Sequence, residues 1–212
     1  MKELFEKENV RVINALGEKH GTITARINDR VNYEITTLRI DKVKNNKKRE
    51  NIHAILNNVS DHTQVTDGRR AEVEFTKDWE LDANRRDLTI NSMFLDLEGN
   101  LYDYFDGQKD LEAERVAFVG KAETRIQEDY LRILRYFRFY GRISQKEDNH
   151  ESSTLQAIRD NVAGMERISG ERIWMEWKKI MMGKFPGPLT LKMIQVGLGP
   201  YIGLPENPTL ER

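Results

Sequence analysis

Cysteine is absent from this 212-residue sequence, so disulfide bonds and thiolate metal sites are excluded. Uninterrupted apolar runs of membrane-spanning length are absent too. The first eight residues carry three acids, two bases and no apolar segment, so they match neither a secretory signal nor a transit peptide. Charged residues make up 33% and apolar residues 38% of the chain, which indicates a soluble globular protein.

An excess of one charge is also missing, because the formal net charge is only −1. Any contact with nucleic acid must therefore come from a local basic cluster. The basic segment Val43–Asn51 lies in a long polar stretch, residues 42–64, that has no sustained period. A loop of this length is uncommon inside a compact domain, so we expect it to be functional or anomalous. Its basic run could contact RNA, although such runs are more often only solvated.

Proline is scarce and confined to one end of the chain. All five prolines follow Phe185, and glycine recurs in the same segment. Both residue types interrupt regular structure. The tail from Gly183 to Arg212 is therefore predicted to be loop-like or incompletely folded.

The first part of the chain alternates in the manner of β-strands and is rich in β-branched and aromatic residues. Turn-forming residues separate these segments, which predicts an antiparallel meander. Met93–Phe105 is predicted to form a hairpin that turns at Glu98–Gly99–Asn100. The other predicted strands are Val10–Ile13, Gly21–Ile27, Tyr33–Ile40, Ala71–Phe75 and, as one more short strand, Val116–Val119.

The second half of the sequence has a helical period. Thr124 with Gln127 three residues later fits a capping box, which predicts one helix running to about Ile143. Further helices are predicted over 154–162 and 171–182, the second capped by Ser169. The predicted fold class is α+β, an antiparallel β-rich part followed by a helical part.

One face of the helix predicted to reach Ile143 is unusually basic. At about 100° per residue, four arginines lie opposite the apolar residues, with Asp129 at the edge. Solvated faces usually mix signs, because like charges three or four residues apart cost roughly 0.2–0.5 kcal/mol per pair. Arginine favours planar partners such as phosphates, base edges or carboxylates. A structural network of arginines and acids across a domain boundary is the alternative. The arginines are Arg132, Arg135, Arg138 and Arg142.

Asp129 and Arg132 add a sharper hypothesis, because they lie about one turn apart. A carboxylate accepts a hydrogen bond from an exocyclic amine, whereas a guanidinium donates to ring acceptors and carbonyls. Such a pair could distinguish C and A from G and U without a nucleic-acid template.

Four motifs around these residues resemble the class II CCA-adding tRNA nucleotidyltransferases. Arg85–Asn91 is similar to the ribose- and phosphate-handling motif of that family, and Asp103–Leu111 is similar to the segment leading out of its catalytic domain. Glu128–Arg135 resembles its amino-acid template for choosing CTP and ATP. Ser169–Ile173 resembles the helix opening that braces the template.

The resemblance implies nucleotide-binding roles in the first motif. Arg86 would contact the incoming triphosphate, with Asp87 and Asn91 near the ribose. Without the resemblance, Arg85-Arg86-Asp87 would be interpreted as a turn-forming surface cluster.

The same resemblance assigns the arginine face. Asp129 and Arg132 would pair with the base, while Arg135 and Arg138 would support the phosphates or the primer. The partners implied are tRNA, CTP and ATP, with no membrane contact.

The implied chemistry is attack by a tRNA 3′-hydroxyl on the α-phosphorus of a nucleoside triphosphate, with two Mg²⁺ ions. Glu34 aligns with a third catalytic carboxylate beside the metal site, although its residue pattern alone indicates an ordinary exposed strand acid. The family supplies the other carboxylates as Asp-x-Asp after a Gly-Gly segment, and this sequence contains neither. Asp96-Leu97-Glu98 is not a substitute, because it lies at a hairpin tip. We therefore expect the chain to begin after the metal-binding motif and to be inactive as given.

The resemblance predicts three parts. Residues 1–118 would be a partial nucleotidyltransferase head domain with 42–64 as an insertion, 119–183 a nucleotide-selecting neck, and 184–212 the start of a helical body. Mitochondrial and cytosolic locations are implied by the family and not by the N-terminus. The alternative is a non-catalytic nucleotide- or tRNA-binding remnant of that family.

Overall fold

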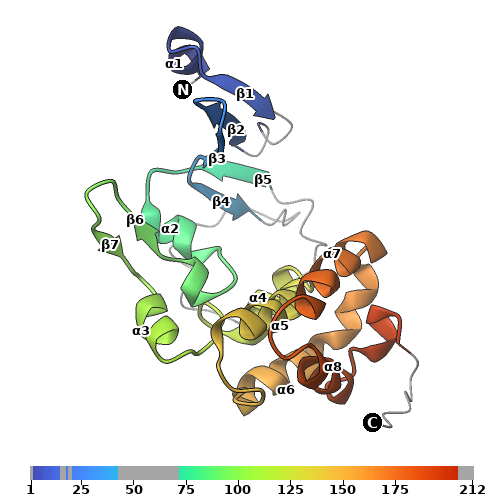
Figure 1. Ribbon diagram of the computed structural model, residues 1–212. Helices are drawn as coiled ribbons and strands as arrows, with labels where there is room; N and C mark the ends of the chain where they lie inside the picture. The colour runs from blue at the N-terminus through green and yellow to red at the C-terminus, as the bar shows by residue number, and fades with distance from the viewer. Residues whose placement is uncertain (1, 15–17, 19–20, 43–71, 205–212) are drawn as a thin grey trace, which may run out of the picture. The chain divides into compact units, whose positions relative to one another are not determined.

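The computed structural model describes two compact units of the chain (Figure 1). One unit holds the N-terminal strands, and the other, residues 86–204, is mostly helical. The division between these units falls after Arg85, because Leu88, Val116 and Phe118 belong to the core of the helical unit. No helix in the described ranges is both long and apolar enough to cross a membrane. The described residues are 2–14, 18, 21–42 and 72–204.

Some sequence predictions concern residues outside these ranges. They are the predicted loop from residue 43 to 64, its basic run, and the end of the tail after residue 204.

The N-terminal unit contains the predicted antiparallel meander, so the α+β class is confirmed. β1 (Arg11–Asn14), β2 (Thr22–Ile27) and β3 (Val31–Thr36) pair in that order. A short helix, α1 (Lys2–Lys7), brings Phe5 into a small cluster with two residues of β2. The buried members of this cluster are Phe5, Ile23 and Ala25.

The single strand predicted over 33–40 is wrong, because the chain changes sheets at Thr37. β3 ends one residue earlier, and β4 (Arg39–Lys42) pairs antiparallel with β5 (Glu72–Phe75). Thr37 donates both its backbone amide and its hydroxyl to the carbonyl of Gly21, at 2.9 and 3.2 Å. This double contact closes the β2–β3 ladder, so the next residues pair elsewhere.

The helical unit opens with the predicted hairpin. β6 (Phe94–Leu95) pairs with β7 (Leu101–Tyr102), and Gly99 supplies the positive φ of the turn, +88°. The strand predicted over 116–119 is wrong, since the segment makes only an isolated bridge to Leu88. Three short helices near these segments were not predicted: α2 (Trp79–Asn84), η3 (Thr89–Asn91) and α3 (Gly107–Glu112).

The long helix predicted from Thr124 to Ile143 is two helices. α4 (Ala122–Glu128) is followed by α5 (Arg132–Ile143). Lys121, not Thr124, occupies the N-cap position of α4. The chain leaves helical geometry at Asp129, whose φ and ψ are −154° and 108°.

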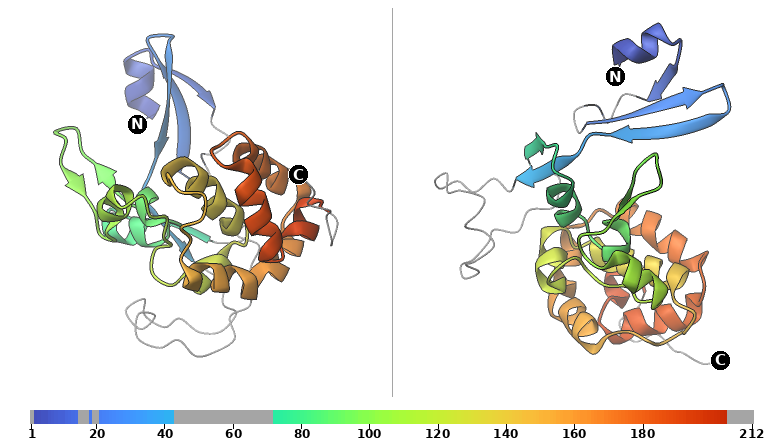
Figure 2. Two further views of the ribbon diagram at one scale, coloured as in Figure 1. Left: turned by 60° about the horizontal axis from the view of Figure 1, so that its bottom comes forward. Right: turned by 90° about the vertical axis from the view of Figure 1, so that its left-hand side faces the viewer.

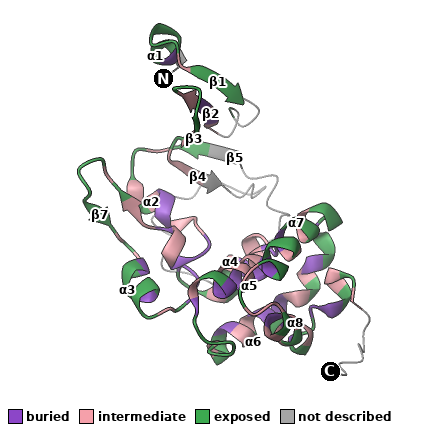
Figure 3. Cartoon of the chain, in the orientation of Figure 1, coloured by how far each residue is buried: buried purple, intermediate pink, exposed green. Residues whose placement is uncertain are grey.

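Helix α5 forms the centre of the core of this unit (Figure 3). Its apolar stripe is buried, with Ile133, Leu134 and Phe137 fully inaccessible, as the periodicity predicted. The two further predicted helices are confirmed as α6 (Ser152–Asn161) and α7 (Gly170–Met181), the latter with Ser169 at its N-cap. A 3₁₀ segment, η4 (Val162–Arg167), joins them.

The prediction of a loop-like tail is wrong for its described part. α8 (Pro186–Gln195) and η5 (Gly199–Ile202) follow α7 and complete the core. Pro186 stands in the first turn of α8, where its missing N–H costs no helical hydrogen bond. Leu189 and Met193, four residues apart, are fully buried. The segment therefore forms a helix despite its proline and glycine content, because Pro186 is compatible with the helix start and the apolar stripe is buried.

Candidate functional site

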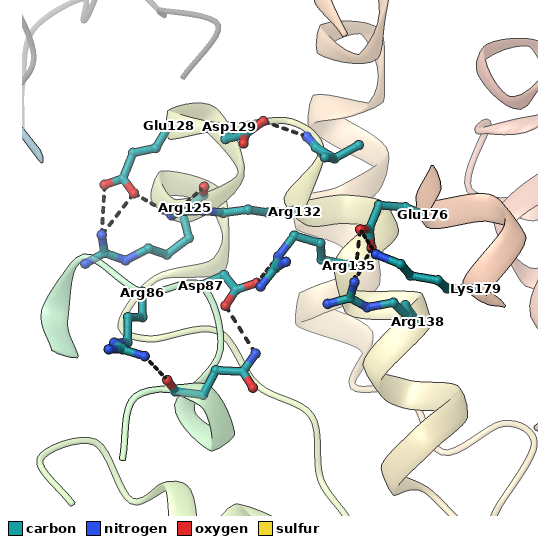
Figure 4. A network of polar contacts seen from close by, with 12 residues as sticks. Arg86, Asp87, Arg125, Glu128, Asp129, Arg132, Arg135, Arg138, Glu176 and Lys179 are labelled. Atoms are coloured by element: carbon teal, nitrogen blue, oxygen red, sulfur yellow. Dashed lines mark hydrogen bonds and ion pairs between the residues drawn. The ribbon is translucent and has the colours of Figure 1, made fainter. Parts of the chain in front are cut away.

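The predicted site residues other than Glu34 lie around the break between α4 and α5 and along α5 (Figure 4). The side chain of Asp129 accepts a hydrogen bond from the amide of Leu131 at 3.1 Å. Tyr130 and Leu131 are both buried. The Tyr130 ring fills the space beside Gly164, where an added Cβ would lie only 2.0 Å from the ring. Two buried anchors therefore fix the break and leave Asp129 partly accessible.

Helix α7 holds the second oxygen of Asp129. Arg172 donates to Oδ2 at 2.8 Å, while Oδ1 accepts the Leu131 amide. The carboxylate is therefore oriented by one contact along the chain and one across the helices. Since an ionised carboxylate has about four acceptor positions, these contacts leave capacity for a further donor.

Arg132 is held by the end of α4. Its Nη1 atom lies 2.5 Å from Glu128 Oε2 and 3.1 Å from the carbonyl of Arg125. Arg125 in turn donates to both oxygens of Glu128, at 2.9 and 3.0 Å. Glu128 thus lies between two guanidiniums, and it sets the direction of Arg132 beside Asp129.

A second cluster centres on Asp87, whose side chain is almost completely buried. Arg135 of α5 donates to Oδ2, and Asn91 donates to Oδ1 at 3.3 Å. Burial raises the pKa of Asp87, but the hydrogen bond and charge of Arg135, together with Asn91, lower it more. The net pKa lies below its usual value, so Asp87 is ionised at neutral pH. The pKa of Arg135 is raised, because this ion pair outweighs the burial that lowers it.

Arg86 lies next to this cluster. Its Nη1 donates to the carbonyl of Asn91 at 3.0 Å, and its guanidinium lies 4.9 Å from the centre of the Phe94 ring. The residues predicted to handle ribose and phosphate, Arg86, Asp87 and Asn91, are therefore in mutual contact. Arg135 links them to the helix that begins at Arg132.

Arg138 forms a third cluster with α7. Its Nη1 lies 2.9 Å from both oxygens of Glu176, and Lys179 lies 3.3 Å from Oε1. Burial lowers the pKa of Arg138, and Glu176 offsets this only in part. The Phe139 ring lies 4.5 Å from the Arg138 guanidinium and also faces Arg135 and Arg142. Acidic and aromatic neighbours thus reduce the repulsion within the arginine face.

Ion pairs between arginines and acids, as in the structural alternative, are present, although they lie within one compact unit and not between the two units. Arg132, Arg135 and Arg138 each have a carboxylate partner, in Glu128, Asp87 and Glu176. These ion pairs hold the arginines in one direction, and such preorganisation also suits the binding of an anion.

Glu34 belongs to the other compact unit. It is exposed on β3, opposite Thr24 of β2. Among the described residues, no group of three or more acidic, histidine or cysteine side chains lies close enough together to hold a metal ion. Glu34 therefore has no such cluster around it in the described ranges. Its catalytic and metal-binding roles stay predictions.

Several supporting residues were not predicted individually. The spacing of Arg125, Glu128 and Arg132, at i, i+3 and i+7, could have indicated their contacts. Spacing along one helix gives no sign of the pairs that cross between helices. The unpredicted partners across helices are Arg172 and Glu176, and Lys179 joins Glu176 from the same helix.

Comparison with known proteins gives a consistent result. The family description "Poly A polymerase head domain" matches residues 1–117, and "Probable RNA and SrmB-binding site of polymerase A" matches residues 150–206. The mitochondrial CCA tRNA nucleotidyltransferase 1 of Homo sapiens is 54% identical over 211 residues, which are 100% of this chain and 43% of that protein. A CCA-adding enzyme of Staphylococcus aureus is 36% identical over 168 residues, 79% of this chain and 36% of that protein.

A solved structure shares the fold as well. The Bacillus stearothermophilus CCA-adding enzyme in complex with CTP has a TM-score of 0.70 and 30% identity, over 92% of this chain and 41% of that one. This chain thus spans less than half the length of these relatives. The head-domain match covers more than half of the chain, and it includes two of the four motifs that carried the resemblance, Arg85–Asn91 and Asp103–Leu111. The chain therefore belongs to the poly A polymerase head-domain family, and the relatives described here are CCA-adding nucleotidyltransferases.

Proposed function

We propose that the protein acts in CCA addition to tRNA, where it selects CTP and ATP and holds the chosen nucleotide. The observation that supports this most directly is the contact between Asp87 and Arg135. It joins the ribose- and phosphate-handling segment to the helix that begins with Arg132, within one compact unit. Base, ribose and phosphate groups would then be bound by neighbouring side chains.

Selection of the base falls to Asp129 and Arg132. The Asp129 carboxylate would accept a hydrogen bond from the exocyclic amine of cytosine or adenine. Arg132 would donate to a ring nitrogen or a carbonyl. GTP and UTP present a carbonyl where CTP and ATP present the amine, so they would place two acceptors against each other.

The remainder of the nucleotide would lie along the other two clusters. Arg86 would contact the triphosphate, with Asp87 and Asn91 near the ribose. Arg135 and Arg138 would support the phosphates or the tRNA 3′ end. Arginine suits these roles because its planar guanidinium can donate two parallel hydrogen bonds to a phosphate.

The proposed metal is Mg²⁺, which in this chemistry activates the attacking hydroxyl and stabilises the leaving pyrophosphate. Glu34 would supply one ligand. The described residues around Glu34 do not fit a complete site, because they offer no cluster of three metal-ligating side chains. We therefore assign no step of the transfer to the metal in this chain.

The relatives extend the proposal to partners and location. Solved relatives are described in complex with CTP and, for the Thermotoga maritima enzyme, with tRNA. ATP as the second donor follows from the proposed reaction. Mitochondria are the proposed location, from the names of the animal relatives, with the cytosol as a second compartment.

Nucleotide binding by the 212-residue chain tests the proposal. Isothermal titration with each of the four ribonucleoside triphosphates should show tighter binding of CTP and ATP than of GTP and UTP. Since a good base contact contributes about 1–3 kcal/mol of discrimination, we expect roughly 5- to 150-fold differences. Equal affinity for all four nucleotides would contradict the proposal.

The variant Asp129→Asn tests whether Asp129 selects the base, because it changes the side chain's hydrogen bonding but hardly its shape. It replaces one acceptor oxygen with a donor, so the preference for CTP and ATP should fall while total binding through the phosphates persists. Asp160→Asn on the exposed face of α6 is the matched control and should leave selection unchanged. If Asp129→Asn loses stability but keeps its nucleotide preference, Asp129 is structural.

A further inference from the structure

The β6–β7 hairpin has two faces of different character. Its register pairs Phe94 with Tyr102 and Leu95 with Leu101, and neighbouring pairs point to opposite faces. Phe94 is partly buried under the Arg86 guanidinium. Leu95 and Leu101 are 68% and 43% exposed, so a cross-strand pair of leucines faces solvent.

The turn of the same hairpin carries a third exposed leucine. Leu97 is fully exposed, and the views of Figure 2 show the hairpin projecting from the helices of its own unit. We call Leu95, Leu97 and Leu101 the leucine face. Monomeric proteins rarely display grouped large apolar side chains of this kind unless something binds there.

Side-chain hydrogen bonds make the turn rigid. Asp96 accepts from the backbone and side-chain amides of Asn100, at 2.7 and 2.8 Å, and from the Tyr102 hydroxyl at 3.2 Å. Gly99 provides the left-handed backbone that the turn requires. The leucine face is therefore already arranged before binding, and a partner would lose little free energy in ordering it.

The hairpin and the segment that follows it carry only negative charges of their own, while Arg86 covers the opposite face. Residues 94–108 contain four acidic residues and no lysine, arginine or histidine. The hydrogen bonds from Asn100 lower the pKa of Asp96, so it stays ionised. Phosphate groups of RNA would be repelled here, and so would a second copy of the same hairpin. The acids are Asp96, Glu98, Asp103 and Asp106.

We propose that the leucine face binds a protein partner through a segment in which apolar side chains are flanked by lysine or arginine. The apolar side chains would pack on Leu95, Leu97 and Leu101, and the basic side chains would meet the carboxylates around them. This surface is separate from the nucleotide-binding clusters, since Arg86 covers the opposite face of the hairpin.

A peptide probe tests this with the complete 212-residue chain. A fluorescein-labelled nine-residue peptide of alternating lysine and leucine is titrated by anisotropy, beside an analogue with glutamate in place of lysine. We expect only the lysine peptide to bind, and its affinity to fall as salt screens the charges. The double variant Leu95→Ser/Leu97→Ser should weaken binding at least tenfold. Leu191→Ser on α8 is the matched control.

A second variant separates docking from folding. Glu98→Lys keeps all three leucines and should also weaken the lysine peptide while its circular dichroism stays unchanged. The proposal is overturned if the glutamate peptide binds equally well, or if neither hairpin variant reduces binding. It is likewise overturned if the leucines are needed instead for RNA binding or for dimer formation in sedimentation experiments.

Discussion

Asp87 combines burial and charge at the centre of the proposed nucleotide site. Its carboxylate is shielded from water, yet it is kept ionised by Arg135 and Asn91. Such a pair contributes little net stability when intact, but removal of one partner leaves the other charge uncompensated. The residue thus couples folding of the unit to the position of Arg135.

Replacement of this carboxylate should therefore destabilise the protein. Asp87→Asn leaves Arg135 without its counter-charge, and we expect a loss of about 2–4 kcal/mol in the free energy of unfolding, because the pair is only partly exposed. Urea unfolding monitored by circular dichroism measures it. Asp160→Asn should change the midpoint very little, and equal effects of the two variants would contradict the prediction.

His150 gives the stability a dependence on pH. Its ring stacks on Tyr140 with centroids 3.8 Å apart, and Nδ1 lies 2.8 Å from the Tyr136 hydroxyl. Its pKa is lowered from the usual 6.5 to about 4, chiefly by burial; Asp148 opposes this effect, and Lys192 adds to it. The unfolded chain therefore takes up this proton more readily than the folded one.

The sign of the effect follows directly. Neutral His150 makes its full contribution to the free energy of unfolding above pH 6.5. This contribution is lost as the pH falls towards 4. Allowing for partial solvent screening, we expect a loss of about 1–2 kcal/mol across this window. Urea midpoints between pH 4 and 7 measure it. His150→Phe should flatten this slope, whereas His53→Gln should retain it. An unchanged slope in His150→Phe would rule out His150 as the cause.

At the scale of elements, the break between α4 and α5 depends on a contact with η4. Gly164→Ala would place a Cβ 2.0 Å from the Tyr130 ring, so the ring or the break must move. We expect a loss of about 1–3 kcal/mol, typical of overpacking, and a lower melting temperature. Gly170→Ala, where nothing lies within 4 Å, is the control and should be nearly neutral. Equal melting temperatures would show that Tyr130 adjusts freely.

The sequence predicted elements where local pattern decides structure. The β1–β3 meander and the β6–β7 hairpin follow from alternation and turn residues. The break at Asp129 could not be seen, because Tyr130 and Leu131 suit a helix locally and Gly164 lies far along the chain. The tail was misjudged because proline was counted as a breaker, although Pro186 stands where a helix tolerates it.

The candidate site was predictable in its residue types but not in its pairings. Asp129 and Arg132 stood out by charge and spacing. The contacts of Asp87 with Arg135 and of Asp129 with Arg172 join residues 48 and 43 positions apart. No local periodicity encodes such pairs, since they depend on how whole helices pack.

At the scale of the whole molecule, we expect the chain to bind nucleotides without transferring them to tRNA. We expect the 212-residue chain to bind CTP but to incorporate no labelled CMP into a tRNA that lacks its CCA end, with Mg²⁺ present. The reason is that the sequence contains no Asp-x-Asp motif. An RNA gel of the labelled product measures it, and robust incorporation would refute the argument. Binding without incorporation is the behaviour of the non-catalytic alternative.

The break at Asp129 has an evolutionary consequence. On a continuous helix, the angle around the helix axis between a carboxylate and each later arginine would be fixed. Here two residues outside both helices, Tyr130 and Leu131, separate the two halves of the proposed base-reading pair, so we expect changes at Tyr130 or Gly164 to turn Asp129 more than Arg132. Under the roles proposed for Asp129 and Arg132, nucleotide preference could therefore drift, or be re-engineered, without substituting either of them.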